Sequence, residues 1–237
     1  MEMCSKKKGS IELELLLLLD IICHDLKNIN QVGMGYLELL LEDKTLGEKQ
    51  RGHAEKAFKA FQSSARLIEN IEKIKRARAF KLELLDLNSI IKETVDEYLL
   101  LTKNEKVKVK IKYSPRENLI INSSPLLKDV FANLIDNAIK HAGKSRVKIS
   151  IDVEDYMMRG KQYYKIAVED NGKGIPDELK RRLFNRQPSK LKGLGLYLAR
   201  TIVEKSGGKI WVEDRVKGNY AKGARFILAL PKRHSFS

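Results

Sequence analysis

Hydrophobic side chains recur at helical spacing along the first third of the chain. Within residues 11–41 they stand three, four or seven positions apart, and the series comprises Leu15, Leu18, Ile22, Leu26, Ile29, Tyr36 and Leu40. A second series fades around Arg78 and contains Ala54, Ala57, Phe61, Ile68 and Ile71. Two long amphipathic segments with a short polar stretch between them predict an antiparallel helical hairpin.

The polar stretch also suggests where the second helix begins. Thr45 stands three residues before Glu48, which is the spacing of a capping box, so we expect Thr45 to cap that helix. Gly33 and Gly35 lie inside the first series, where each costs about 1 kcal/mol relative to alanine. They predict either a bend after residue 24 or a close approach of another segment.

The apolar seam of such a hairpin is too narrow to be buried by two helices alone. Apolar residues also occur on more than one face of the first helix, so we expect a second copy of the chain to pair with it. The prediction is a homodimer in which residues 9–80 form a four-helix bundle. Residues 79–87 break the periodicity and predict a domain boundary.

The second part of the chain mixes helical and alternating patterns. Residues 106–112 alternate lysine with apolar residues, which predicts a strand with one wet and one buried face. Residues 88–101 predict a helix capped by Asn88 or Ser89. The remaining expected elements are strands at 119–121, 147–153, 164–168, 209–212 and 226–230 and helices at 125–141 and 195–206. We expect an α/β sandwich over residues 86–233, joined to the helical hairpin.

Composition and charge narrow the function only slightly. The 237 residues are 43% hydrophobic and 32% charged, as in a folded domain with a real core. The formal net charge of +15 favours anionic partners. We expect no nucleic acid, because the basic residues follow neither a zinc-finger spacing nor an RNA-binding aromatic pattern. A lysine-rich solvated surface is the simpler explanation of the charge.

Cysteine content and the apolar runs bear on the compartment. Cys4 and Cys23 are too few for a disulfide framework and have no partner at metal-ligand spacing, which favours a reducing, cytoplasmic setting. Cys23 is best explained as a small packing residue. The longest purely apolar run is residues 15–19, far short of a bilayer span, and no signal peptide precedes it. We therefore expect a chain that is neither inserted nor exported.

A histidine, an acid and an amide interrupt the first apolar series within one helical turn. His24 and Asn28 are four residues apart and share a helix face, while Asp25 is adjacent to the histidine. This grouping offers a nucleophile, a base and an orienting amide. A lone histidine on an amphipathic helix is more often a surface or packing residue, so the grouping needs support from elsewhere.

Four stretches of the second part carry polar residues and glycines that a sandwich core does not need. Amide oxygens suit a metal ion, cations suit phosphates, and glycines allow a backbone to pass close to a ligand. A helix start can also receive a phosphate. Taken singly, each stretch has an ordinary explanation as a helix end, a tight turn or a loop. The residues are Asn133, Asn137, Lys140, His141, Asp170, Gly172, Gly174, Phe184, Lys192, Gly193 and Gly195.

In this order and spacing, the four stretches resemble the nucleotide-binding boxes of the superfamily that contains histidine kinases, DNA gyrase and MutL. Their ATP-binding fold is the Bergerat sandwich. Residues 24–28, His-Asp-Leu-Lys-Asn, resemble the acceptor box of sensor histidine kinases, and residues 11–80 resemble their dimerisation hairpin. The resemblance implies ATP and Mg²⁺ as cofactors, autophosphorylation of His24 and transfer of the phosphoryl group to an aspartate of a response regulator.

The resemblance also implies roles for single residues. Asp25 would take the imidazole proton, and Asn28 would serve a phosphatase activity on the regulator. Asn137 would hold Mg²⁺, supported by Asn133. Adenine would be bound by Asp170, the backbone at Gly172 and Gly174 would lie against the nucleotide, Phe184 would anchor a lid over residues 185–192, and Lys140, His141, Lys192, Gly193 and Gly195 would surround the phosphates.

Departures from the family pattern leave two alternatives. Ile29 stands where many members have a proline, and Leu191 stands where a longer glycine motif would begin. One alternative is a gyrase- or MutL-like ATPase, which has a water-activating glutamate at the position of Asn133. The other is a non-catalytic dimeric scaffold, against which the intact acceptor and ATP boxes argue. The amide at position 133 disfavours ATP hydrolysis by water.

Overall fold

A computed structural model describes residues 2–101, 108–116, 119–143, 146–184 and 194–233. The chain separates into two compact units, residues 1–75 and 76–237. Among the helices of the described residues, none combines the length and the hydrophobicity that a bilayer crossing requires.

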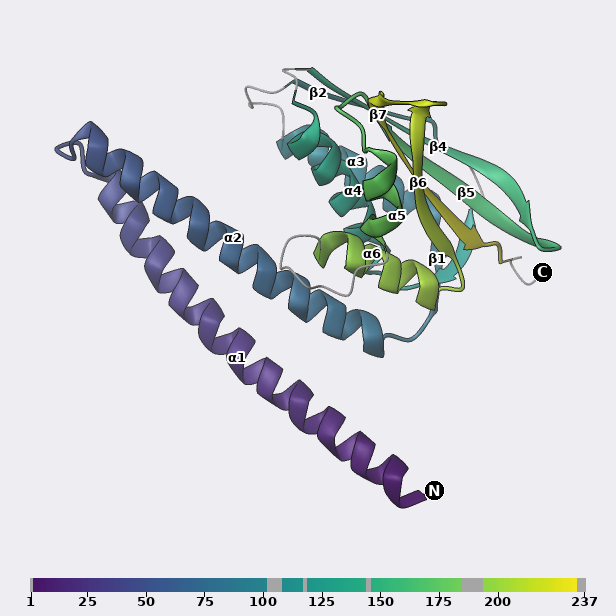
Figure 1. Cartoon of the computed structure of the whole chain (residues 1–237), viewed down its shortest axis with the longest axis horizontal. Helices are drawn as coiled ribbons and strands as arrows, with labels where there is room; N and C mark the ends of the chain where they lie inside the picture. The colour runs from purple at the N-terminus through teal and green to yellow at the C-terminus, as the bar shows by residue number, and fades with distance from the viewer. Residues whose placement is uncertain (1, 102–107, 117–118, 144–145, 185–193, 234–237) are drawn as a thin grey trace. The chain divides into compact units, whose positions relative to one another are not determined.

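The first unit is a hairpin of two long helices. Helix α1 covers Glu2–Glu42, and helix α2 covers Glu48–Ala79 and runs back alongside it (Figure 1). This confirms the predicted hairpin. Cys23, Ala54 and Ile68 are buried in it, with 5%, 5% and 4% of their surface exposed, so Cys23 does pack as a small apolar residue.

Polar contacts fix the alignment of the two helices. Asn30 is buried, and its amide donates a hydrogen bond of 2.9 Å to the Ser64 hydroxyl of the facing helix. Lys27 forms an ion pair of 3.5 Å with Glu72 nearer the open end of the hairpin. A buried amide that loses its partner costs about 1–3 kcal/mol, so the Asn30–Ser64 bond favours one register.

The two glycines of α1 differ in their surroundings. A Cβ added at Gly33 would lie 2.5 Å from Cε1 of Phe61, whereas a Cβ at Gly35 would meet nothing within 4 Å. Gly33 therefore permits a close approach of α2, and Gly35 has no such reason to be a glycine. α1 passes through both positions as an uninterrupted helix.

The connection between the helices corrects the predicted cap. Asp43 Oδ1 accepts hydrogen bonds from the backbone N–H and the hydroxyl of Thr45, at 2.8 and 2.7 Å. The Thr45 hydroxyl is thus used inside the turn, and α2 begins only at Glu48, so the capping box is wrong. Carbonyl oxygens at and just after the end of α1 find a hydrogen-bond donor in Arg51, which donates to those of Leu41 and Asp43 at 2.7 and 2.8 Å.

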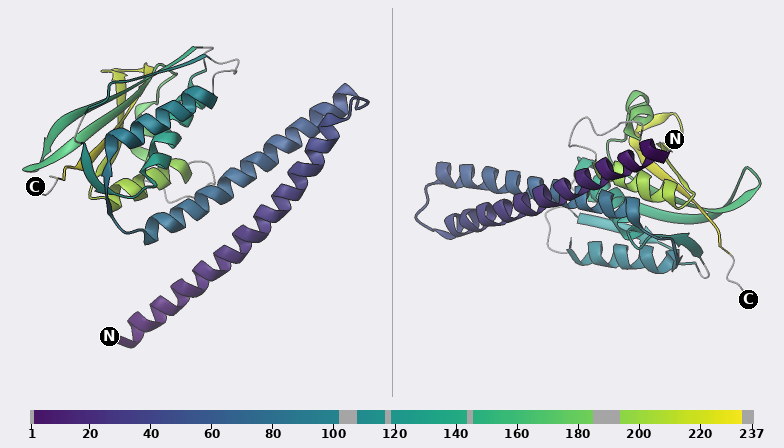
Figure 2. Two further views of the ribbon diagram at one scale, coloured as in Figure 1. Left: turned by 180° about the vertical axis from the view of Figure 1, so that it is seen from behind. Right: turned by 90° about the horizontal axis from the view of Figure 1, so that it is seen from below.

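The second unit is built on a five-stranded sheet with three helices on one face (Figures 1 and 2). The strand order is β2-β4-β5-β7-β6, and only the β2–β4 pair is parallel. The strands are β2 (Lys108–Tyr113), β4 (Arg146–Met158), β5 (Lys161–Asp170), β6 (Lys209–Val216) and β7 (Asn219–Pro231). The helices are α3 (Leu87–Leu101), α4 (Leu127–His141) and α6 (Leu194–Lys205). This is the expected α/β sandwich.

The core lies between the sheet and these helices. Alternating residues of β4 and β5 face it, and the apolar faces of α4 and α6 complete it. Phe131, Leu134, Ile135, Ile166, Leu198 and Ile202 are all 0% exposed.

Two short elements were absent from the prediction, and one cap was wrong. Strand β1 (Glu83–Asp86) pairs with β3 (Ile120–Ser123) inside the stretch expected to be irregular, and helix α5 (Asp177–Leu183) follows the glycine-rich loop. Neither Asn88 nor Ser89 caps α3. Asp86 does, because its carboxylate accepts the backbone N–H of Asn88 at 3.0 Å and the Ser89 hydroxyl at 2.7 Å.

Candidate functional site

His24 presents its ring to solvent from the surface of α1. Its side chain is 73% exposed, and Nδ1 lies 3.1 Å from Oδ1 of Asp25. A carboxylate only accepts hydrogen bonds, so the neutral ring carries its proton on Nδ1. Nε2 then keeps its lone pair, which makes it the nucleophilic atom of the ring.

Asn28 is the third member of this group. Its amide nitrogen lies 3.5 Å from His24 Nδ1, one turn further along α1. That distance is at the outer limit of a hydrogen bond, so Asp25 and not Asn28 sets the ring orientation. The side chain of Asn28 is exposed and remains available to a group that docks beside His24.

In the second unit, Asp170 at the end of β5 is a buried carboxylate with one engaged oxygen. Oδ1 accepts the backbone N–H groups of Gly172 and Ala224 at 2.7 and 3.4 Å. Among the described residues, nothing donates to Oδ2. Burial raises the pKa of Asp170, and the two backbone hydrogen bonds oppose that rise. A carboxylate oxygen that accepts no hydrogen bond within the protein is suited to accept one from a ligand.

The glycines after Asp170 are required by the packing of the protein itself. A Cβ at Gly172 would lie 3.1 Å from Ala142 Cα, and a Cβ at Gly174 would lie 1.6 Å from the carbonyl oxygen of Tyr220. Gly174 also has a φ of +67°, which favours glycine. The sequence suggested contact with a nucleotide as the reason for these glycines, and the structure adds a second reason.

Helix α4 connects the remaining predicted residues. Asn133 and Asn137 are half-buried, and Asn133 Nδ2 donates to the Gly195 carbonyl oxygen of α6 at 3.4 Å. A Cβ at Gly195 would lie 2.8 Å from Asn133 Oδ1, so glycine allows the two helices to meet there. Lys140, expected to contact phosphate, forms an ion pair with Asp136.

The predicted stretches do converge along α4. Gly195 meets α4 at Asn133, and Gly172 meets its other end, where a Cβ at Gly172 would lie 3.4 Å from the carbonyl oxygen of His141. The Phe184 ring packs edge-on against Phe226, with centroids 6.5 Å apart, and this contact fixes the position of the ring. Residues 185–193, which include the predicted lid with Lys192 and Gly193, lie outside the described residues.

Three residues near the site were not found by sequence reasoning. The Tyr98 hydroxyl on α3 donates to Asp136 Oδ1 at 2.9 Å, and this anchors α4 next to Asn137. Arg200 of α6 donates to the carbonyl oxygen of Phe184, where the predicted lid begins. Asp136 stands beside Asn137 in the sequence and could have been noticed, whereas Tyr98 and Arg200 resemble ordinary residues of amphipathic helices.

The donor set fits a magnesium ion that arrives with a nucleotide. Within the described ranges, no group of three or more histidine, cysteine or acidic side chains could hold a metal alone. Mg²⁺ usually binds one or two protein oxygens together with substrate phosphates and water. Asn137 is half-buried, and its amide has no hydrogen-bond partner among the described residues, so it can supply one such oxygen.

The fold and the converging residues define a Bergerat-type ATP-binding unit that follows the helical hairpin in the sequence. Residues 122–234 match the family model described as "Histidine kinase-, DNA gyrase B-, and HSP90-like ATPase". The family predicted from the motifs is thus confirmed for this unit.

Individual relatives show to which class of protein within this family the chain belongs. The adaptive-response sensory kinase SasA of Crocosphaera subtropica is 30% identical over 234 residues, which are 90% of this chain and 58% of SasA. The catalytic domain of the histidine kinase ThkA is 30% identical with a TM-score of 0.52, over 65% of this chain and 97% of that domain. The chain belongs to the sensor histidine kinases and contains their catalytic core.

A further solved structure covers both units of the chain. ThkA in complex with the response regulator protein TrrA has the same fold, with a TM-score of 0.60 and 24% identity over 96% of this chain and 64% of ThkA. The chain spans from 24% to 58% of the length of the first curated relatives it matches.

Proposed function

We propose that this chain is an ATP-dependent protein-histidine kinase that phosphorylates His24 and passes the phosphoryl group to an aspartate of a response regulator. The observation that carries the proposal is the exposed His24 ring, whose Nδ1 faces the Asp25 carboxylate at 3.1 Å. That geometry directs the lone pair of Nε2 outward, as an attack on a phosphoryl group requires.

Each residue of the site has a chemical task in this proposal. Mg-ATP supplies the phosphoryl group when bound. Asp170 Oδ2 accepts the adenine amino hydrogen, and the Asn137 amide oxygen binds Mg²⁺. His24 Nε2 forms the bond to the γ-phosphorus as the bond to the ADP oxygen breaks. The ring becomes positively charged, and Asp25 takes up the Nδ1 proton that it already faces.

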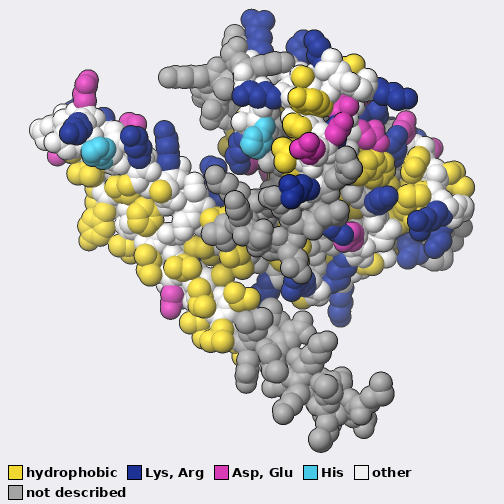
Figure 3. Space-filling view, in the orientation of Figure 1, with side chains coloured by type: hydrophobic (Ala, Val, Ile, Leu, Met, Phe, Trp, Pro, Cys, Tyr) yellow, Lys and Arg dark blue, Asp and Glu magenta, His cyan; other side chains and the backbone are white. Residues whose placement is uncertain are grey.

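The exposed face of α1 supports a homodimer. Large apolar side chains stay uncovered along the helix, and Figure 3 shows hydrophobic side chains gathered there. They are between 42% and 72% exposed and comprise Leu17, Leu18, Ile21, Ile22, Leu26, Ile29, Val32, Tyr36, Leu39 and Leu40. A second hairpin would bury them and form a four-helix bundle. The regulator would dock against this bundle near His24.

The decisive experiment measures phosphate incorporation from labelled Mg-ATP. We expect acid-labile, base-stable label on the wild-type chain and none on His24→Gln, which removes the nucleophile and leaves the nucleotide site intact. His53→Gln is the matched control, because His53 is also exposed and lies on α2. Label on His24→Gln, or its loss in His53→Gln, would contradict the assignment of the acceptor.

The ATP site is tested separately from the acceptor. Asn137→Ala and Asp170→Ala remove the proposed metal and adenine contacts, so both variants are expected to lose nucleotide binding yet stay dimeric. Titration with ATP and measurement of the mass in solution check the two properties. A normal ATP titration of either variant would overturn its assigned role.

Asn28 is proposed to orient a water molecule that attacks the phosphorylated regulator, while Asp25 serves the forward reaction. Asn28→Ala is therefore expected to keep autophosphorylation and lose dephosphorylation of the regulator. Asp25→Asn is expected to impair autophosphorylation first. Time courses of both reactions test this, and equal loss of both activities in Asn28→Ala would indicate a damaged helix instead.

The two alternatives make different predictions for the same assays. A gyrase-like ATPase would release inorganic phosphate without labelling the protein, and it needs a base where Asn133 donates its amide to Gly195. A dimeric scaffold would bind partners without any label or ATP turnover. Stable label on His24 excludes both.

A further inference from the structure

The face of the sheet opposite the helices carries a cluster of cations. In β2 and β4, Ile111 and Ile149 are buried toward the core, and the residues next to them in sequence point the other way. Lys110, Lys112 and Lys148 are therefore exposed on the outer face of neighbouring strands.

These lysines are close to one another without compensation. Lys110 and Lys148 are directly opposite in the parallel β2–β4 register, and like charges at such positions destabilise a sheet. Within the described ranges, no carboxylate forms an ion pair with any of the three lysines. Glu169 of β5, an acid that faces the same side of the sheet, is already held by Arg225 Nε at 3.1 Å and Arg215 Nε at 4.0 Å.

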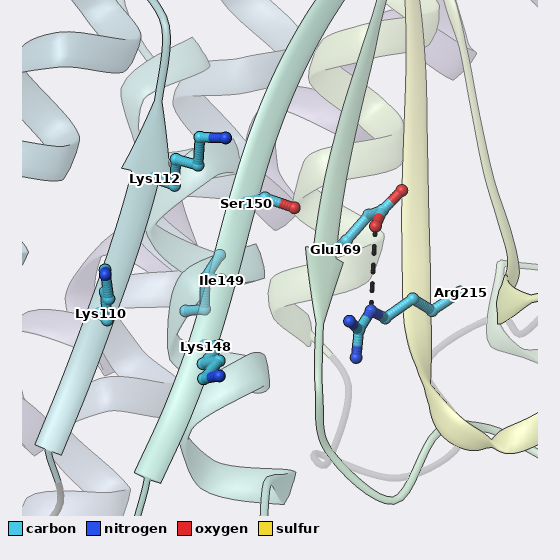
Figure 4. A pocket seen from close by; sticks show the side chains of 7 residues that line it. All are labelled: Lys110, Lys112, Lys148, Ile149, Ser150, Glu169 and Arg215. Atoms are coloured by element: carbon cyan, nitrogen blue, oxygen red, sulfur yellow. Dashed lines mark ion pairs between the residues drawn. The ribbon is translucent and has the colours of Figure 1, made fainter.

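The cluster surrounds a hollow of about 280 Å³. Figure 4 shows the residues around it, which come from β2, β4, β5 and β6: Lys110, Lys112, Lys148, Ile149, Ser150, Glu169 and Arg215. Four of these seven are cationic, and the Ser150 hydroxyl can donate a hydrogen bond. The lining offers no aromatic ring on which a nucleobase could stack.

We propose that this hollow binds a small multivalent anion of the phosphate class, for which inorganic pyrophosphate is the model ligand. Such an anion would neutralise the opposed lysines and receive charge-assisted hydrogen bonds from them. A hollow of about 280 Å³ has room for a small molecule of this kind.

The hollow is distinct from the proposed ATP site. Glu169 and Asp170 are consecutive residues of β5, and their side chains point to opposite faces of the sheet. Glu169 lines the hollow, whereas Asp170 is buried on the side of the helices. The two sites can therefore be disabled independently.

The test is calorimetric titration of the whole chain with pyrophosphate in metal-free buffer at constant ionic strength. We expect one binding event that weakens at least tenfold in the double variant Lys110→Gln, Lys148→Gln. The matched control is Lys92→Gln, Lys161→Gln, which removes the same charge from exposed positions of the same unit and is expected to bind as the wild type does. Orthophosphate is expected to bind more weakly than pyrophosphate.

Three results would overturn the proposal. Equal weakening in the control pair would mean that net charge alone attracts the anion. Loss of binding in Lys140→Gln together with full binding in Lys110→Gln, Lys148→Gln would assign the event to the ATP site. Tighter binding of polyglutamate than of pyrophosphate, dependent on Lys110 and Lys148, would identify an acidic protein segment as the occupant instead.

Discussion

The two units of this protein differ in how far they bury their apolar side chains. In the α/β unit, Phe131, Leu134 and Ile135 of α4 are 0% exposed, so a single chain completes that core. In the hairpin, Ile21 and Ile29 of α1 are 59% and 60% exposed. One unit buries its apolar side chains within the chain, and the other leaves them exposed along α1. The difference fits the proposal that α1 pairs with a second copy, whereas the α/β unit has a core of its own.

The largest expected effect is on stability and comes from a cavity in the core of the α/β unit. Phe131→Ala leaves a cavity under the sheet and is expected to lower the free energy of unfolding by about 3–5 kcal/mol. Leu179→Ala, at a residue 50% exposed on α5, is the control and is expected to change it by less than about 0.5 kcal/mol. Denaturant unfolding followed by the fluorescence of Trp211, the single tryptophan, reports on this unit alone. Equal effects of the two variants would contradict the burial of Phe131.

The next largest effect is expected at the exposed apolar face of α1. The pair Ile22→Asp, Ile29→Asp puts charges into the proposed helix–helix interface and is expected to weaken dimerisation at least about a hundredfold, with the Trp211 transition unchanged. Leu100→Asp, Leu101→Asp is the matched control, because both leucines are 72% exposed on α3. Analytical ultracentrifugation measures the outcome. A dimer that tolerates the first pair would place the interface elsewhere.

Within the hairpin, the two glycines of α1 are expected to respond with opposite sign. Gly33→Ala inserts a methyl group 2.5 Å from Phe61, and overpacking should exceed the gain in helix propensity, for a net loss of about 1 kcal/mol. Gly35→Ala meets open space and is expected to gain about 0.5–1 kcal/mol. Thermal melting followed by circular dichroism compares them, and two gains would mean that the Phe61 ring moves aside freely.

The smallest effect lies at Asp170 and depends on pH. Burial raises the pKa of this carboxyl in the folded state, so its contribution to stability is complete below the unfolded value of about 3.9 and is lost as the pH rises through the folded value. Asp170→Asn does not titrate. We expect it to be slightly more stable than the wild type at pH 7 and to lose that advantage in acid. A constant difference across the pH range would show that burial does not penalise the charge.

Sequence patterns predicted most of this architecture. Period-3.6 and period-2 patterns located both hairpin helices and the long strands, because residues such as Ile149 and Ile151 must alternate toward one core. The contact of His24 with Asp25 was also readable, since the two residues are adjacent and need no long-range folding to meet.

The failures share a physical cause. Strand β1 is only four residues long and owes its existence to pairing with β3, which lies more than thirty residues later. The contact of Tyr98 with Asp136 joins two helices and leaves no local signature. Capping was misassigned where an aspartate competed. Asp43 binds the Thr45 hydroxyl inside the turn, and Asp86 takes the capping role expected of Asn88 or Ser89.

The buried Asn30–Ser64 pair restricts how a movement can travel along the hairpin. If α1 slid along α2 by one helical turn, the Asn30 amide would enter the apolar seam without a partner, at a cost of about 1–3 kcal/mol. A stimulus that travels through the hairpin without this cost would therefore have to leave Asn30 aligned with Ser64.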